Sequence, residues 1–328
     1  MNIVFMGTPD FAKESLKALV EAGHNIQLVN TNPDKPKGRG MKMQYTPVKE
    51  YALEKGLEIE QPLKIKNNKD IVTKIKEKNP EVICVVAYGK IIPNEILEIP
   101  EKGAINVHGS LLPKYRGAAP IQWAVLNGDK KTGITTMYIS DKMDEGDILL
   151  KREIEIGEDD TLGEVWENLS KVGAELLVET LEKLEKGTVT RIPQTTEGLG
   201  EPTYAPMLDK SIAEIDWENK SACEIKNLVR GLNPIMGAYT FINNKKYKFW
   251  KVQVLDEINF LERFNYSKKD FDGKKNGEIL LADSKNGMFL KAKDGVIEVI
   301  EIQAESAKRM NCKDFLRGNN NSIKPTNV

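Results

Sequence analysis

The strongest constraint on the fold is a strand, a helix and a second strand in direct succession at the beginning of the sequence. Residues 3–6 form a short apolar run, and Gly7 then turns the chain. An amphipathic segment follows, with Thr8 as the expected N-cap and Pro9 at the first helical position. It is expected to stop at Gly23, shortly before a second apolar run. Strands joined so closely through a helix lie parallel in one sheet, which predicts an α/β domain.

The same alternation continues through the first half of the chain. Residues 82–87 are almost entirely apolar, as expected for a central strand that is covered on both faces. Further strands are predicted over 104–108, 134–139 and 148–156, and helices over 47–56, 70–78, 118–126 and 162–184. We therefore predict that residues 1–187 form a doubly wound, mostly parallel α/β sheet.

The alternation of predicted strands and helices ends after residue 187. Residues 188–207 show neither the helical nor the strand periodicity of apolar residues, and they contain three prolines and two glycines, which predicts a linker. Beyond it, short β-rich runs are separated by turn pairs such as Asn286-Gly287, a strong hairpin signal. About five antiparallel strands and one helix over 222–232 predict a small OB-like β-barrel over 208–318. A polar tail, 319–328, completes the chain.

Charge limits how the protein can contact nucleic acid. The chain has 48 Lys and Arg against 49 Asp and Glu, whereas a protein that simply coats nucleic acid is more basic. Residues 208–328 nevertheless hold 21 basic against 17 acidic side chains, while residues 1–207 hold 27 against 32. Residues 245–251 interleave lysines with aromatic rings, a pattern that suits RNA as well as ordinary solvated surface. Any RNA contact is therefore expected to be local.

Composition also bears on location. No apolar run approaches the roughly 20 residues that a membrane span needs, and the N-terminal residues read as a strand rather than a signal peptide. Cys84, Cys223 and Cys312 are scattered and form neither a disulfide framework nor a metal cluster. We expect a reduced, cytoplasmic, monomeric protein of two domains without membrane contact.

Two histidines restrict the choice of an imidazole for chemistry near neutral pH. His24 follows a glycine in a connection, where an exposed and inert ring is expected. His108 ends a predicted strand, which is where open α/β sheets place their active sites. Asn106 lies two residues earlier and faces the same side. Taken alone, the pair fits either one cleft or two polar strand ends with local hydrogen bonds.

The residues that follow are more specific. Residues 106–120 read Asn-Val-His-Gly-Ser-Leu-Leu-Pro-Lys-Tyr-Arg-Gly-Ala-Ala-Pro, and residues 144–147 read Asp-Glu-Gly-Asp. Together they resemble the folate-dependent formyltransferases, whose signature is an Asn-x-His strand end, a Ser-Leu-Leu-Pro loop and a later Asp-x-Gly-Asp turn. The resemblance implies a Rossmann-like catalytic domain. It extends over nearly the whole chain, with further matching segments at 5–11, 34–40, 203–207, 215–217 and 233–234.

Within that family, these further segments are similar to members that formylate methionine on initiator tRNA. The implied reaction moves the formyl group of 10-formyltetrahydrofolate to the amino group of initiator methionyl-tRNA through a tetrahedral intermediate. Asn106 is expected to donate a hydrogen bond to the oxyanion, and His108 to act as general base or proton shuttle. Asp144 is expected to orient the imidazole, with Asp147 of the same turn as the alternative. No metal or nicotinamide is implied.

The resemblance also implies two binding elements. The loop after the Asn-x-His strand is expected to line the folate pocket with its backbone. Its residues are Ser110, Leu111, Leu112 and Pro113. A glycine-containing basic loop is expected to order against the acceptor stem of the tRNA through phosphate attraction, although by itself it also fits a solvated loop. Its basic residues are Lys37, Arg39 and Lys42.

Two other functions stay open at this point. A formyltransferase acting on an amino sugar nucleotide can carry a similar His-Gly-Ser-Leu-Leu-Pro run, but the basic loop and the positive C-terminal half favour tRNA. A non-catalytic folate- or RNA-binding protein is the alternative of another class. The order of Asn106, His108 and Asp144 argues against it, since a binding protein needs none of them. Two departures from the family pattern, after Pro234 and after Ala205, leave the catalytic motif intact.

Overall fold

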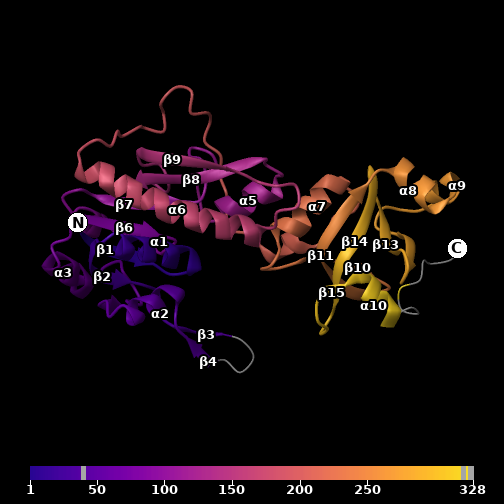
Figure 1. Ribbon diagram of the computed structural model, residues 1–328, viewed down its shortest axis with the longest axis horizontal. Coiled ribbons are helices and arrows are strands. Elements are labelled where there is room, and N and C mark those ends of the chain that lie inside the picture. The colour runs from indigo at the N-terminus through magenta and orange to yellow at the C-terminus, as the bar shows by residue number, and fades with distance from the viewer. Residues whose placement is uncertain (38–41, 319–322, 324–328) are drawn as a thin grey trace. The chain divides into compact units, whose positions relative to one another are not determined.

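The computed structural model describes residues 1–37, 42–318 and 323, which fall into two compact units (Figure 1). Each unit is assembled from three stretches of chain. The first unit contains residues 1–121, 131–155 and 165–207, and the second contains residues 122–130, 156–164 and the chain from 208 onward. Two short segments of the first half therefore belong to the second unit.

The first unit is built on a seven-stranded sheet with the order β5-β2-β1-β6-β7-β8-β9. Its strands are β1 (Asn2–Gly7), β2 (Asn25–Asn30), β5 (Ile59–Glu60), β6 (Val82–Val86), β7 (Ala104–His108), β8 (Lys131–Tyr138) and β9 (Ile148–Glu155). The first five strands in that order pair parallel, and β8 and β9 add to the edge in antiparallel pairing. The predicted doubly wound, mostly parallel class is confirmed.

Helices cover both faces of this sheet. They are α1 (Asp10–Glu21), α2 (Pro47–Glu54), α3 (Lys69–Glu77), α4 (Asn94–Leu97) and α6 (Leu162–Glu185), whereas most of α5 (Pro120–Leu126) belongs to the second unit. Ile75 of α3 packs with Val4 and Ile83 on one face. Val107 points to the opposite face, where a Cβ added at Gly173 of α6 would lie 3.2 Å from its Cγ1. The sheet is thus enclosed between α3 and α6.

The start of α1 differs from the prediction. Pro9, not Thr8, is the N-cap residue, and no side chain caps the helix. The Thr8 hydroxyl instead donates to the carbonyl of Tyr88 at 3.3 Å and accepts from the side-chain amide of Asn32 at 3.0 Å. Because these residues follow β1, β6 and β2, Thr8 ties together the ends of three adjacent strands.

The second unit is built on a six-stranded antiparallel sheet, which confirms the predicted class of this part. The strand order is β10-β11-β14-β13-β12, and β15 pairs with β14. The strands are β10 (Ala238–Ile242), β11 (Lys245–Leu255), β12 (Ile279–Asp283), β13 (Gly287–Ala292), β14 (Gly295–Ala304) and β15 (Met310–Asn311). Short helices not predicted from the sequence are η1 (Lys210–Ala213), α8 (Glu257–Phe264), α9 (Lys268–Asp272) and α10 (Cys312–Gly318).

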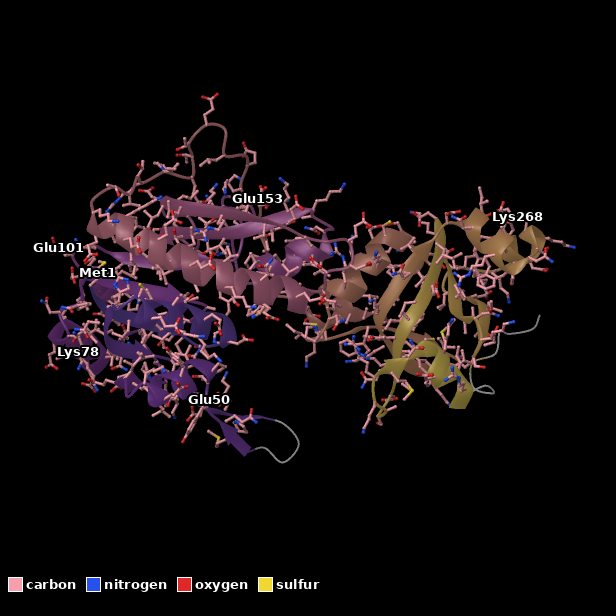
Figure 2. All side chains as sticks on the ribbon, in the orientation of Figure 1. Met1, Glu50, Lys78, Glu101, Glu153 and Lys268 are labelled. Carbon is pink, nitrogen blue, oxygen red and sulfur yellow. The ribbon has the colours of Figure 1, made fainter. Side chains whose placement is uncertain are left out.

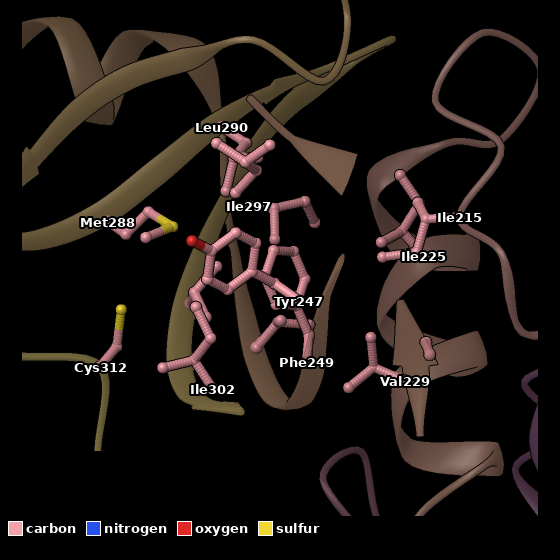
Figure 3. Packing of buried hydrophobic residues seen from close by; sticks show 14 of the residues in the cluster. Ile215, Ile225, Val229, Tyr247, Phe249, Met288, Leu290, Ile297, Ile302 and Cys312 are labelled. Atoms are coloured by element: carbon pink, nitrogen blue, oxygen red, sulfur yellow. The ribbon is translucent and has the colours of Figure 1, made fainter. Parts of the chain in front are cut away.

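One helix, α7 (Ala222–Gly231), covers the core of this sheet. It begins with a capping box in which Ser221 and Glu224 satisfy each other's backbone N–H groups. Figure 3 shows Val229 of α7 beside the ring of Phe249 from β11, and both side chains are buried in the same cluster. Charged side chains lie outside this core: Lys268 (Figure 2) forms an ion pair with Asp272 at 2.8 Å.

The segment predicted as a linker, 188–207, carries no helix or extended strand. It is nevertheless held against the first unit, because Ile192 and Ile148 of β9 exchange two backbone hydrogen bonds of 2.9 Å. Farther along, Ala205 donates its N–H to the carbonyl of Arg116 at 2.7 Å. Of the predicted polar tail, only Ile323 lies within the described residues, and it is buried.

Candidate active site

The site begins at the C-terminal end of β7. Asn106 and His108 occupy alternate positions of that strand and leave the sheet on the same face, the one that carries Val4 and Ile83. His108 is buried, with 5% of its surface exposed, and Asn106 is half-buried. Across the described ranges, no residue hydrogen-bonds the Asn106 side chain. Its amide is therefore available to a ligand.

Both nitrogens of the His108 ring face oxygen atoms. Nε2 lies 2.9 Å from the carbonyl oxygen of Tyr115, and Nδ1 lies 3.7 Å from Oδ1 of Asp144. A carbonyl oxygen can only accept, so the bond to Tyr115 requires a proton on Nε2. The Tyr115 carbonyl thus holds one side of the ring, and the other side is directed at Asp144.

Asp144 lies in the turn between β8 and β9, and the structure holds it toward His108. Its Oδ2 accepts the backbone N–H of Gly117 at 2.8 Å, which fixes the carboxylate against the segment after the Ser-Leu-Leu-Pro loop. The turn itself demands particular backbone shapes. Asp144 has a φ of +54°, and a Cβ at Gly146 would lie 1.8 Å from the carbonyl oxygen of Tyr138. No residue other than glycine fits there.

Asp147, the alternative acid, is placed differently. Its backbone carbonyl accepts the N–H of Tyr138 at 2.9 Å, which closes the turn onto β9. Within residues 1–37, 42–318 and 323, the structure gives no contact between the Asp147 carboxylate and His108. Of the two acids, Asp144 is therefore the one that lies beside the imidazole.

The predicted folate loop is fixed by a residue that the sequence did not single out. Thr135 of β8 pairs with His108 across the sheet, and its hydroxyl donates to the carbonyl of Ser110 at 2.6 Å. The hydroxyl oxygen of Thr135 in turn accepts the N–H of Leu112 at 3.1 Å. Ser110, Leu112 and Pro113 are buried, and Leu111 is half-buried. The spacing of β8 could have suggested Thr135 only if its register against β7 were known.

The predicted basic loop is flanked by a two-stranded hairpin. Its strands, β3 (Lys35–Lys37) and β4 (Lys42–Gln44), pair Lys37 with Lys42, whereas Arg39 lies outside the described residues. At the base of this hairpin, Lys49 Nζ lies 2.5 Å from Asp34 Oδ2, and Gln61 donates to Asp34 at 2.9 Å. Burial opposes ionisation of Asp34, but these two partners outweigh it and lower the pKa of that carboxyl.

No group of three or more His, Cys, Asp or Glu side chains among the described residues could hold a metal ion. No helix among them has the length and the apolar composition that crossing a membrane requires.

Two domain families match this chain. Residues 1–181 match the formyl transferase family, and residues 207–320 match the formyl transferase C-terminal domain. A protein named methionyl-tRNA formyltransferase from Caldanaerobacter subterraneus subsp. tengcongensis is 48% identical over 98% of this chain and 97% of its own length. One of the same name from Ruminiclostridium cellulolyticum is 48% identical, over 97% of each chain.

Similar solved structures are more distant in sequence. HypX from Aquifex aeolicus in complex with tetrahydrofolic acid has a TM-score of 0.61 at 17% identity and covers 99% of this chain and 48% of that one. WlaRD, a sugar 3N-formyl transferase solved with dTDP and 5-N-formyl-THF, has a TM-score of 0.62 at 18% identity, covering 94% and 99%. At this level of identity, the likeness concerns the fold.

Proposed function

This chain belongs to the formyl transferase family, and from that premise we propose a role for each of three side chains beside the end of β7. The enzyme transfers the formyl group of 10-formyltetrahydrofolate to the amino group of methionine on initiator methionyl-tRNA. The observation that carries this function is the 48% identity to enzymes of that name across both domains. The geometry around His108 supports the chemistry.

In the proposed reaction, the neutral amine attacks the formyl carbon, and a new C–N bond forms while the carbonyl oxygen becomes an oxyanion. The C–N10 bond then breaks, the amine loses a proton and N10 gains one. Asn106 donates an N–H to the oxyanion, a role for which its half-buried amide without a described partner is suited. An amide does this without titrating.

His108 is proposed as the proton shuttle. Its Nε2 faces the Tyr115 carbonyl and its Nδ1 faces Asp144, so the ring is oriented to carry a proton between the attacking amine and the leaving nitrogen. Asp144 stabilises the imidazolium and fixes the orientation of the ring.

Binding roles follow the same assignment. The backbone of 110–113, held by Thr135, is proposed to line the folate pocket. The basic loop of Lys37, Arg39 and Lys42 is proposed to meet the acceptor stem. The domain over 208–318 is proposed to contact tRNA, with 1–187 as the catalytic domain and 188–207 as the connection between them. In the 208–318 domain, the hairpin of β10 and β11 combines a basic and an aromatic side chain, as suits RNA. Lys246 Nζ lies 3.4 Å from the ring centre of Tyr239. We also propose that the protein is a monomer and acts in the cytoplasm.

A competition between two acceptors tests this function. The purified protein is given 10-formyltetrahydrofolate together with charged initiator tRNA and an amino sugar nucleotide, and both formylated products are measured. We expect formyl-methionyl-tRNA and no formylated sugar. Formylation of the sugar nucleotide alone would establish the rival within the family. Folate binding without either product would establish a binding protein.

A further inference from the structure

We propose that Gln194 is a positioning residue for formyl transfer that acts through Asp144. Gln194 lies in the irregular segment after α6, where the sequence predicts only a linker. The inference rests on the proposed role of Asp144 beside His108. It assigns to this segment the task of holding the turn that carries the carboxylate.

The Gln194 side chain is buried and fully engaged. Its Nε2 donates to the carbonyl oxygens of Asp144 at 2.8 Å and Gly146 at 2.9 Å. Its Oε1 accepts from Nε of Arg116 at 3.0 Å and from Nη2 at 2.8 Å. A side-chain amide has two N–H donors and one oxygen with two lone pairs, so all of its hydrogen-bonding capacity is used.

Arg116 also contacts the turn. Its guanidinium is buried, and Nη1 lies 3.3 Å from Oε1 of Glu145, the turn residue between the two carbonyls that Gln194 binds. The next residue, Gly117, donates its N–H to the Asp144 carboxylate. One short segment therefore holds Asp144 directly through its backbone and indirectly through Gln194.

The turn has a physical need for such a clamp. A φ of +54° is an uncommon conformation for an aspartate, and it persists only where the surroundings impose it. The Asp144 oxygen lies 3.7 Å from Nδ1 of His108, beyond hydrogen-bonding distance, so a modest shift of the turn decides whether the two groups interact. Because Gln194 holds the backbone carbonyls of Asp144 and Gly146, it limits that shift.

Two substitutions separate the functions of the Gln194 amide. Gln194→Glu keeps an oxygen for Arg116 but removes both N–H groups that bind the turn, and Gln194→Met keeps the size and removes all four hydrogen bonds. We expect kcat to fall about 10- to 100-fold in both, the size of effect known for residues that orient metal ligands, with little change in KM for folate or tRNA. Gln27→Glu is the matched control, because the Gln27 amide makes one long bond of 3.5 Å to Asn2.

A double-mutant cycle with Asp144→Asn distinguishes positioning from general support of the fold. If Gln194 acts through Asp144, Gln194→Glu has little further effect on kcat once Asp144→Asn is present. Equal fold losses in both backgrounds would overturn the inference, as would wild-type turnover of both folded Gln194 variants while Asp144→Asn is slow. Wild-type turnover of Asp144→Asn would instead remove the proposed role of Asp144. Thermal unfolding shows whether each variant is folded. If one of the two Gln194 variants is not folded, the cycle is measured with the remaining Gln194 variant.

Discussion

The Nε2 atom of His108 lies 2.9 Å from the carbonyl oxygen of Tyr115, a residue whose φ is +61°. That backbone conformation is uncommon outside glycine, and it lies in the segment between the folate loop and Arg116. The bond to this carbonyl sets the orientation of the ring before any substrate arrives and directs Nδ1 at Asp144, 3.7 Å away. Loss of the ring and loss of its carboxylate partner should therefore have different consequences.

Replacing His108 is expected to damage catalysis, whereas replacing His24 is not. His108→Ala removes the proposed proton shuttle and should lower kcat roughly 100- to 10,000-fold in steady-state formylation assays. His24→Ala serves as the control, because His24 lies in the connection before β2, away from β7. Turnover near that of the wild type in the His108 variant would exclude this ring from the mechanism.

Asn106→Ala is expected to separate turnover from folate affinity. The oxyanion exists only along the reaction path, so losing its donor should lower kcat about 100- to 1,000-fold and leave the dissociation constant of folate nearly unchanged. Equilibrium binding and single-turnover rates measure the two effects. A parallel loss in folate binding would show that Asn106 contacts the ligand in its ground state.

Asp144→Asn keeps the size of the side chain and removes its charge. We expect a steep fall in kcat and an altered pH–rate profile, because the imidazolium loses its neighbouring carboxylate. Asp147→Asn is the matched variant in the same turn, and the structure gives its carboxylate no contact with His108 in the described part of the chain. If Asp147→Asn is the more damaging change, the two acids have been assigned the wrong way round.

Binding of tRNA is expected to depend on salt more than binding of folate. Each phosphate contact releases counterions, so the apparent affinity for tRNA should fall steeply as salt rises. Folate affinity should change less, since an apolar pterin pocket depends little on screened charge. Arg39→Ala should weaken tRNA use and leave the folate constant unchanged. A salt-independent tRNA constant together with a silent Arg39 variant would favour the sugar-nucleotide rival.

His24 is expected to make the fold sensitive to mild acid. The His24 ring is half-buried, not exposed as predicted from the sequence. This burial lowers the pKa of His24 below its usual 6.5, and the N-terminal ammonium adds to the effect. Between the folded pKa and 6.5 the unfolded chain binds more protons, so stability is complete above 6.5 and is lost as pH falls through this window. Urea unfolding at about pH 7.5 and about pH 5.5 should show a smaller loss in His24→Gln than in the wild type. Equal losses would contradict this.

Local signals predicted the regular elements well. The Thr46-Pro47 pair predicts the beginning of α2, and the Thr46 hydroxyl accepts the N–H of Lys49 at 3.1 Å as an N-cap. Alternation along β7 was enough to place Asn106 and His108 on one face. Asp144 came from the family resemblance, because no local pattern connects a turn between β8 and β9 to the end of β7.

Residues that act through tertiary contacts were missed. Gln194 lies in a segment without hydrophobic period, and nothing in its neighbours indicates that its amide meets Arg116. The helices α8 and α9 are too short for a period to be read, and their burial depends on Phe260 and Phe271 meeting Phe289 in a separate aromatic cluster. Side chains of this kind become predictable only when the register of the surrounding strands is known.

The interleaving of the two units also has a consequence during synthesis. The carbonyls of Gly157 and Asp160 accept hydrogen bonds of 3.1 Å from Arg230, and Leu126 packs against the core of the second unit. At roughly 5–20 residues per second, the ribosome exposes these earlier segments several seconds before their partners emerge. The nascent chain must therefore keep two short stretches unassembled while the sheet around them forms. Order of translation and order of assembly therefore differ in this enzyme. In a chain arrested before Arg230, residues 122–130 and 156–164 lack the part of the second unit that they pack against.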